Sequence, residues 1–423
     1  MEEKIFDPFA DFQSCKLASG FTLQHLQIDR PFVDIRIAVR TGSLEDPVGK
    51  EGIAHFTEHL FSQNGNLPLV EMIRLFKLGI NPGSTGNEKV EYSCRIQRKK
   101  EKLVDGLRHF FSMYFGIAKM NGFDQQKKIV LEEYDQQNRF PLLAQHSKTI
   151  GNIIFPGTFW SRSVSRLGTP ESIESFTQDD IFEYWNKNYH PSNVTMITAG
   201  GITIDEIASL LDQTIGDYKM PQLKTAEDIK KPIIATLGPV KRKTNIHTYN
   251  KKDLYGGMPI QSKGTFTSYA FLPMEMTLYK LSILSEMLNL LLLDSIREKL
   301  GSAYEINASL VSDIIAKQIK VNSPSFNLEI QDTVLSTIQE NIDSLPFKSD
   351  LFEDVKDGKI VRSSSYDASV ASILSRAISD TMDYGSIVTQ AEKIERYKSV
   401  TIEDIAECVE YMQPEYLLHI IEI

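Results

Sequence analysis

The chain has 423 residues and a formal charge of −10, from 56 acidic and 46 basic residues. This length predicts two or three domains, each with its own core, and the acidic balance argues against nucleic acid or an anionic membrane as a partner. The most apolar stretch, residues 281–293, is interrupted by polar side chains. It is too short and too polar to span a bilayer, so we expect a buried helix there.

Cysteine usage and the first residues indicate the compartment. Three cysteines lie far apart in no metal-binding spacing, which favours free thiols in a reducing environment. The opening residues are acidic and contain no apolar stretch, so neither a signal peptide nor a basic transit peptide is visible. Together these features predict a cytoplasmic protein.

Strands and helices alternate along the chain. Apolar residues occupy every second position of residues 34–39, which predicts a strand, and a Gly- and Pro-containing loop follows. A helix is expected from Ile53, and further helices are expected at 102–119 and 124–138. Residues 194–199 form the next predicted strand. This interleaving favours mixed α and β layers.

Two pairs of segments echo each other across the chain. Residues 175–181 and 399–405 each open a helix with a threonine cap and an acid three residues later, followed by a proline and an apolar strand. Residues 73–79 and 296–301 share Ile-Arg at the start and Leu-Gly at the end. Both pairs occur in the same order, so they predict an internal duplication. The Pro- and Lys-containing stretch 224–243 is expected to separate the halves.

The segment Gly-Ile-Ala-His-Phe-Thr-Glu-His carries the clearest chemical signal. On a helix His55 and His59 lie one turn apart and point the same way, so their imidazoles can bind one Zn²⁺. Glu58 borders the same face. The alternative is a pair of histidines with ordinary contacts, but a chain with eight histidines should show this pattern by accident in roughly one case in a hundred.

This residue set predicts metal-assisted hydrolysis. Zinc lowers the pKa of bound water towards about 7 and polarises a scissile carbonyl. Glu58 can remove the proton of the attacking water and pass it to the leaving amine. A zinc site also needs a third protein ligand, for which the acids of residues 129–134, Glu132 and Glu133, are the candidates.

Residues 41–61 closely resemble the zinc-site region of the pitrilysin/insulinase (M16) peptidase family, which includes the mitochondrial processing peptidases. Residues 129–133 look like the family segment that supplies the third ligand, 74 residues after His59. Register with that segment favours Glu133 over Glu132 as the ligand.

The resemblance runs through most of the chain, with further matches at residues 167–169 and 189–193. It implies an α+β fold of two homologous domains, each a mostly antiparallel sheet with helices packed on one face. The zinc-binding catalytic domain is expected at 1–225, a linker at 226–245 and the second domain at 246–423.

The second half contains a further match. Arg297 and Tyr304 have six residues between them. They resemble the family pair that binds the substrate backbone and stabilises the tetrahedral intermediate. By themselves these residues favour a plainer interpretation, a helix-end arginine and a half-buried tyrosine, with Gly301 making the turn to a strand. The resemblance implies a dimer, with an identical or related chain, in which the second domain of one chain completes the zinc site of the other. Such a chamber admits unfolded peptides, which add as an extended strand to a sheet edge.

The sequence departs from the family in several places, and two of them concern the expected site. Where the family has Asn-Ala on its substrate-binding edge strand, Asn81 is followed by Pro82 and Gly83, so one backbone N–H is lost. We expect Asn81 and Gly83 to contact substrate. Gln126 replaces a common acid seven residues before Glu133, which removes a negative charge next to the metal ligands, so we expect a weaker metal affinity or a tuned site.

Three functions remain open from the sequence. The retained site residues favour a zinc endopeptidase that cuts unstructured peptides, with Glu58 as general base. The alternative is a non-catalytic subunit that binds peptides or supports a larger assembly. Within the enzyme class, the chain could instead mature one specific precursor.

Overall fold

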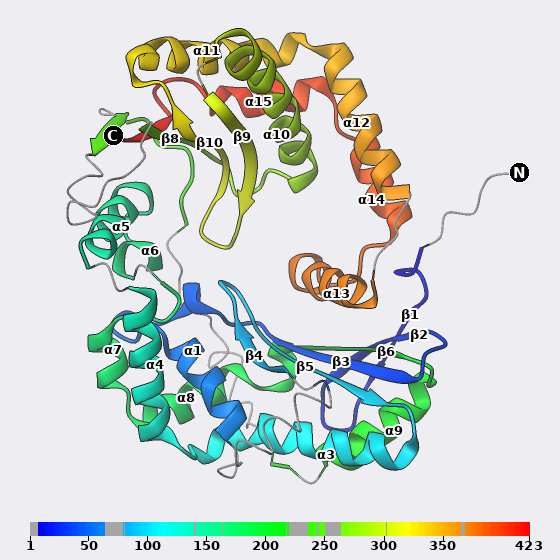
Figure 1. The fold of residues 1–423 in the computed structure, drawn as a ribbon. Helices are drawn as coiled ribbons and strands as arrows, with labels where there is room; N and C mark the ends of the chain where they lie inside the picture. The colour runs from blue at the N-terminus through cyan, green and yellow to red at the C-terminus, as the bar shows by residue number, and fades with distance from the viewer. Residues whose placement is uncertain are drawn as a thin grey trace, which may run out of the picture.

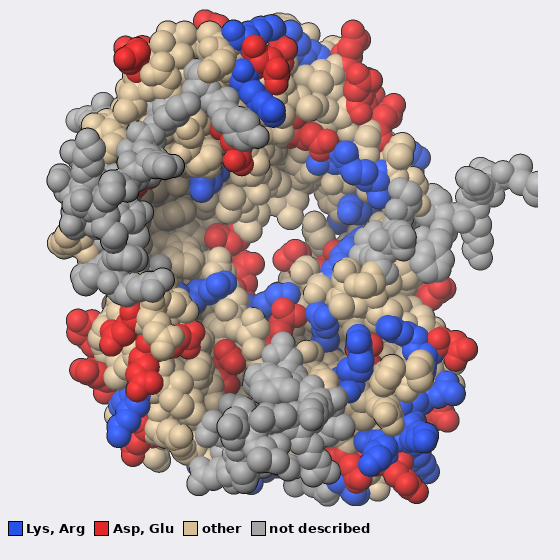
Figure 2. Space-filling model, in the orientation of Figure 1, with Lys and Arg blue, Asp and Glu red and all other residues tan. Residues whose placement is uncertain are grey.

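The computed structural model describes residues 7–63, 79, 81–138, 141–163, 165–216, 218–219, 236–242, 245–249, 264–301, 303–364 and 369–423. The echo segment 73–78 and most of the predicted linker lie outside these residues, so the linker boundaries stay a prediction. Two sheets face each other across the molecule (Figure 1). In the space-filling view the molecule is hollowed between its halves, and side chains of both charges surround the opening (Figure 2).

The first sheet has the strand order β1-β2-β6-β3-β5-β4, and only β2 and β6 run parallel among its neighbours. Its strands are β1 (Phe12–Lys16), β2 (Thr22–Gln27), β3 (Phe32–Val39), β4 (Asn81–Thr85), β5 (Val90–Gln97) and β6 (Val194–Gly200). In β5 buried and less buried residues alternate, as expected for a strand with one face in the core. The strands predicted at 34–39 and 194–199 are confirmed as β3 and β6.

The second sheet repeats this arrangement in the order β7-β11-β8-β10-β9, again with one parallel pair, β7 and β11. Its strands are β7 (Ile246–Tyr249), β8 (Gly264–Leu272), β9 (Ala303–Ser312), β10 (Lys317–Phe326) and β11 (Leu418–Glu422). Taken in chain order, β7 to β11 correspond to β2 to β6 in both neighbour and direction. The prediction of two homologous, mostly antiparallel domains is therefore confirmed.

Helices of the first half cover one face of the first sheet (Figure 1). The helical segments of this half are η1 (Ser43–Glu45), α1 (Ile53–His59), η2 (Leu60–Gln63), α3 (Lys100–Gly116), η3 (Ile117–Lys119), α4 (Phe123–Gln137), α5 (Pro141–Ile154), α6 (Phe159–Arg162), α7 (Pro170–Ser175), α8 (Gln178–Asn188), η4 (Pro191–Asn193) and α9 (Ile204–Ile215). The helices predicted from Ile53 and at 102–119 and 124–138 are confirmed in α1, α3 with η3, and α4.

Helices of the second half cover the corresponding face of the second sheet. The helical segments of this half are α10 (Leu278–Leu292), the π-helix η6 (Leu293–Lys299), η7 (Leu328–Ile330), α11 (Gln331–Ser344), η8 (Leu345–Phe347), α12 (Ser349–Ser364), α13 (Val370–Tyr384), α14 (Gln390–Lys398) and α15 (Ile402–Glu410), and all but α13 pack on this sheet. The apolar stretch at 281–293 falls on α10, a largely buried helix. Among the described residues, no helix combines the length and apolarity needed to cross a bilayer.

The echoed helix starts have the predicted capping boxes. The Thr177 hydroxyl accepts the backbone N–H of Asp180, whose carboxylate accepts the N–H of Thr177, and α8 begins there. Thr401 and Asp404 do the same at α15. Each helix then leads into the equivalent strand, β6 or β11, so the local echo reflects a repeated structural unit.

Each half also sends a helix to the far face of the other half's sheet. Leu374 and Ile378 of α13 pack in a cluster with Leu26 and Ile197 of the first sheet. The same helix receives a hydrogen bond from Arg36 of β3 to Ser375, at 2.7 Å. Helix α13 therefore ties the second half to the first (Figure 1).

The reciprocal contact uses α5 and α6. Ile154 and Phe159 pack in one cluster with Phe271 and Ile420 of the second sheet. The helices that belong to each sheet thus cover one face, as predicted. The exchange of helices between the halves extends that prediction, and it fixes the two sheets relative to each other.

Candidate metal centre

Helix α1 is held at its first turn by the loop before it. The Asp46 carboxylate accepts the backbone N–H groups of Gly52, at 2.6 Å, and Ala54, at 3.2 Å. It therefore caps the helix, which receives no side-chain cap from Gly52. Gly52 has φ +91°, and a Cβ there would lie 2.1 Å from the Leu167 carbonyl oxygen, so only glycine fits.

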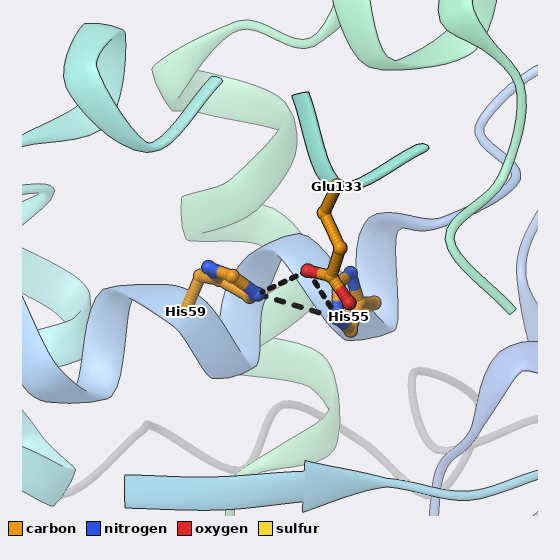
Figure 3. Close-up of side chains that lie close together, drawn as sticks. All are labelled: His55, His59 and Glu133. Atoms are coloured by element: carbon orange, nitrogen blue, oxygen red, sulfur yellow. Dashed lines mark hydrogen bonds and ion pairs between the residues drawn. The ribbon is translucent and has the colours of Figure 1, made fainter. Parts of the chain in front are cut away.

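Three side chains from two helices converge beyond this turn (Figure 3). His55 and His59 of α1 bring their Nε2 atoms to 3.3 Å from each other. Glu133 of α4 places Oε2 3.4 Å from the His59 Nε2 and 3.7 Å from the His55 Nε2. Among the described residues, these three form the one group of histidine, cysteine and acidic side chains that lie close enough together to hold a metal ion.

These distances fit a zinc ion. Zinc binds histidine nitrogen and carboxylate oxygen at about 2.0–2.2 Å in tetrahedral sites, so two ligand atoms lie roughly 3.3–3.5 Å apart. The atom pairs of His55, His59 and Glu133 lie at 3.3, 3.4 and 3.7 Å. Two imidazoles and one carboxylate leave a fourth position open, as in catalytic zinc sites.

Gln126 supports the site from α4. Its buried side chain, 2% exposed, brings Oε1 to 3.0 Å from the His59 Nδ1. Because the amide oxygen only accepts, Nδ1 is the donor in this contact, so a neutral His59 ring would have its Nε2 lone pair available for a metal ion. The amide does this without the negative charge that an acid would add.

Burial and mutual charge set the proton affinities of the cluster. Burial, followed by the nearby His59, lowers the pKa of His55 to about 4, so this ring is neutral near pH 7. Burial also acts to lower the pKa of His59, but the hydrogen bond to Glu133 and the charge of Glu58 raise it overall. The His59 hydrogen bond holds the pKa of Glu133 below its usual value, with burial opposing.

Glu58 lies beside the cluster, against the edge of the first sheet. The Thr85 hydroxyl of β4 donates a hydrogen bond to Glu58 Oε2 at 3.2 Å. Burial raises the Glu58 pKa to about 7, while His59 and the Thr85 hydrogen bond act against this rise. A carboxylate of this kind can exchange protons near neutral pH, as general acid–base catalysis requires.

Arg297 and Tyr304 belong to the other half. Arg297 lies in the π-helix η6, Gly301 makes the expected turn with φ +59°, and Tyr304 is the second residue of β9. At the opposite end of β9, the backbone N–H of Ile314 donates to Glu88 in the turn between β4 and β5, at 2.7 Å. At about 3.3 Å per residue, Tyr304 stands roughly 26 Å from the last residue of β9. The pair therefore lies at the end of β9 away from this contact with the first half.

Strand β4 carries the remaining predicted residues. The pairing of β4 with β5 changes register between Asn81 and Ser84, so Pro82 and Gly83 form an irregular segment. The Asn81 side chain lies outside the described atoms, and its contact with substrate stays a prediction. Gly83 lies directly against Glu58.

Sequence reasoning missed two residues of the site. Thr85 shares a strand face with Gly83 by the two-residue period, but its contact with Glu58 depends on how α1 lies against β4. Asp46 stands six residues before Gly52, outside the usual capping position, so the ordinary helix-start pattern does not reveal it.

Two family models match the chain. The model described as "Insulinase (Peptidase family M16)" matches residues 25–151, and "Peptidase M16 inactive domain" matches residues 175–358. The chain belongs to the M16 peptidase family. The first match contains the His55, His59 and Glu133 cluster, and the second continues into the duplicated half.

Several proteins named as proteases are similar to this chain in sequence or in fold. An "Uncharacterized zinc protease" of Rickettsia bellii is 23% identical over 350 residues, 79% of this chain and 76% of that protein. The "Mitochondrial-processing peptidase subunit beta" of Dictyostelium discoideum is 21% identical over 229 residues, 52% of this chain and 46% of that protein. The crystal structure of the periplasmic protease PqqL from Escherichia coli has a TM-score of 0.76 and 16% identity, covering 99% of this chain and 48% of that one. The chain thus spans about half the length of the latter two relatives. These likenesses support a peptidase-like function.

Proposed function

We propose that the chain is a zinc-dependent endopeptidase that hydrolyses peptide bonds in unstructured peptides or precursor segments. The observation that carries this proposal is the spacing of the Nε2 atoms of His55 and His59 and the carboxylate of Glu133, which matches the edges of a zinc tetrahedron. The partly buried Glu58 beside them supplies a proton acceptor. The relatives named as zinc proteases support the same chemistry.

The proposed mechanism assigns one task to each residue. His55, His59 and Glu133 would hold Zn²⁺, which supplies Lewis acidity towards water and a carbonyl oxygen. Gln126 keeps the His59 tautomer with Nε2 unprotonated. Glu58 accepts the proton of the attacking water and delivers it to the nitrogen of the departing amine, so hydrolysis leaves the base unchanged.

The peptide is proposed to bind along β4. This strand ends the first sheet in the described part of the chain, and it runs beside Glu58. An extended peptide can continue such a sheet by backbone hydrogen bonds, for which we propose Asn81 and Gly83 as contacts. Pro82 offers no N–H there, so one bond of a regular ladder is lost.

Arg297 and Tyr304 are proposed to complete the site of a second chain. Their place in the other half, at the far end of β9, supports this arrangement over one within a single chain. Tyr304 would donate a hydrogen bond to the oxygen that becomes negative, and Arg297 would bind the peptide backbone. The partner is proposed to be an identical or a related chain.

The second candidate is a non-catalytic, peptide-binding or scaffold subunit. It is favoured by one observation: the model that matches residues 175–358 describes an inactive M16 domain, the half in which Arg297 and Tyr304 lie. In that case a related chain would supply the chemistry.

Cleavage of a quenched-fluorescence peptide library separates the two candidates. The zinc-loaded protein should cleave, a chelator should stop cleavage, and Glu58→Gln should lower kcat by about a thousandfold while keeping its zinc. The control is Glu132→Gln, which replaces an exposed acid beside Glu133. A wild-type protein that holds zinc but cleaves nothing would favour the non-catalytic candidate.

Mixing two inactive variants tests the shared site. Glu58→Gln and Arg297→Ala should each be inactive alone. If a homodimer builds each site from two chains, mixed dimers contain one intact site, and equal mixtures recover about a quarter of wild-type activity. No recovery after subunit exchange would contradict a site shared between identical chains.

A further inference from the structure

Two residues of β4 contact the carboxyl group of Glu58 from the same side. The Thr85 hydroxyl donates to Oε2 at 3.2 Å. A Cβ built on Gly83 would lie 2.6 Å from both Cγ and Oε1 of Glu58, so the bare backbone of Gly83 lies against the other oxygen. Residues two apart on a strand share a face, which explains why one strand meets both oxygens.

The backbone of Gly83 is suited to this contact. Its φ of +141° is a conformation that side chains with a Cβ rarely adopt, and it falls where β4 changes register against β5. Glycine thus meets two requirements at one position. It permits the irregular strand, and it leaves the space that the Glu58 side chain occupies.

Helix α1 alone does not determine where the Glu58 carboxyl group points. Glu58 is the penultimate residue of a seven-residue helix, and three rotatable side-chain bonds separate its carboxyl oxygens from the backbone. A general base must be held to within about 0.5 Å of its working position. The contacts from β4 supply a restraint on both oxygens that the helix lacks.

We propose that Gly83 and Thr85 are positioning residues for Glu58: Gly83 opens the space for its side chain, and Thr85 fixes the orientation of its carboxyl group. This inference rests on the proposed function of Glu58 as general base. Because the peptide is also proposed to add to β4, one strand sets the position of both the base and the bond to be cut. The Gly83 backbone can lie along the peptide while the missing side chain makes room for the base.

Thr85→Val and Thr85→Ser test the hydrogen bond. Valine keeps the shape of threonine without the hydroxyl, so kcat should fall about tenfold, with KM within about twofold and zinc content unchanged. Serine keeps the hydroxyl and should restore kcat to within about threefold of the wild type. A full kcat in Thr85→Val, or a serine variant as slow as the valine variant, would overturn the role of Thr85.

Gly83→Ala tests the space by a double-mutant cycle that uses neither peptide nor metal. In the wild-type background, alanine should lower the Tm because its Cβ collides with Glu58. In a Glu58→Ala background the colliding atoms are gone, and the loss of Tm should shrink to half or less. Gly157→Ala is the control, because Gly157 also has positive φ, +75°, but nothing within 4 Å of its Cβ position. Its Tm change should be the same in both backgrounds.

An equal loss of Tm for Gly83→Ala in the two backgrounds would overturn the role of Gly83. If Gly83→Ala does not fold, the Thr85 variants still decide the proposal. A wild-type protein that cleaves no peptide overturns the proposed function, and the positioning role falls with it. An active wild type with an equally active Thr85→Val overturns this inference alone.

Discussion

Helices α1 and α10 occupy equivalent places in the two halves, between β3 and β4 and between β8 and β9, yet they use their polar residues differently. On α10, Ser285 and Asn289 stand one turn apart and both bond the backbone of Ala308 on β9. The Ser285 hydroxyl donates to its carbonyl at 3.3 Å, and the Asn289 oxygen accepts its N–H at 2.9 Å. His55 and His59 of α1 have the same spacing, but their ring nitrogens face each other and Glu133.

The difference shows what separates a structural contact from a candidate site on one topology. In the second half the Ser285 and Asn289 side chains each form a hydrogen bond with the backbone of Ala308, so the helix and the strand are joined directly. In the first half two imidazole nitrogens converge with a carboxylate, an arrangement that a shared cation stabilises. The duplicated fold supplies the position, and the side chains alone supply the chemistry.

The largest expected effect separates two adjacent acids on α4. Glu133→Gln should lower zinc affinity at least about a hundredfold, because it replaces the charged carboxylate of a proposed ligand by a neutral amide. The neighbouring Glu132→Gln should leave the affinity within about twofold. Competition with a chelating dye measures both. Equal losses of zinc affinity in the two variants, or a loss confined to Glu132→Gln, would contradict the proposal that Glu133 is the third ligand.

The next largest effect concerns the pH dependence of stability, for which a buried histidine of each sheet can be compared. His25 in the first sheet bonds the Thr198 hydroxyl, at 2.7 Å, and the Ile202 carbonyl, at 2.8 Å, through its two ring nitrogens. The Nδ1 of His419 in the second sheet is buried with no partner in the described part of the chain. Burial lowers the pKa of His419 to about 4.

As the pH falls, the unfolded chain gains the His419 proton near pH 6.5, before the folded chain does. The stabilisation is therefore complete above about pH 6.5 and is lost progressively towards pH 4, by about 3 kcal/mol. Urea unfolding of wild type and His419→Gln between pH 7 and 4 measures this loss. The variant should lose less stability over this range, and identical pH profiles would contradict the prediction.

The smallest effect compares the caps of the two equivalent helices. The Asp46 carboxylate caps α1, and the Thr277 hydroxyl accepts the N–H of Lys280 at the start of α10. Asp46→Ala and Thr277→Ala should each cost about 1 kcal/mol of stability. Only Asp46→Ala should also weaken zinc binding, because α1 carries two of the proposed ligands. Chemical unfolding and zinc titration measure the two quantities, and equal zinc affinities would show that the Asp46 cap does not position the histidines.

Local patterns made much of this molecule predictable. The spacing of His55 and His59 places both rings on one helix face whatever surrounds the helix. The capping boxes of α8 and α15 are equally local, and their repetition revealed the duplication. The choice of Glu133 over Glu132 needed a comparison with the family segment that supplies the third ligand. Both residues fall on α4, and only the packing of α4 against α1 distinguishes them.

Long-range packing was not predictable in the same way. The amphipathic pattern of α13 indicates a buried face, but it does not indicate that the sheet of the other half covers it. The contact of Thr85 with Glu58 depends on how α1 lies against β4, which no local pattern specifies. The sequence likewise predicted a helix end near Arg297, where the chain forms a π-helix from Leu293 to Lys299.

X-ray diffraction from crystals of the zinc-loaded protein, recorded on both sides of the zinc absorption edge, tests the central claim most directly. The account predicts one anomalous peak per chain, about 2.0–2.2 Å from the Nε2 atoms of His55 and His59 and from a carboxylate oxygen of Glu133. Anomalous density elsewhere, with these three side chains joined only by hydrogen bonds, would contradict it.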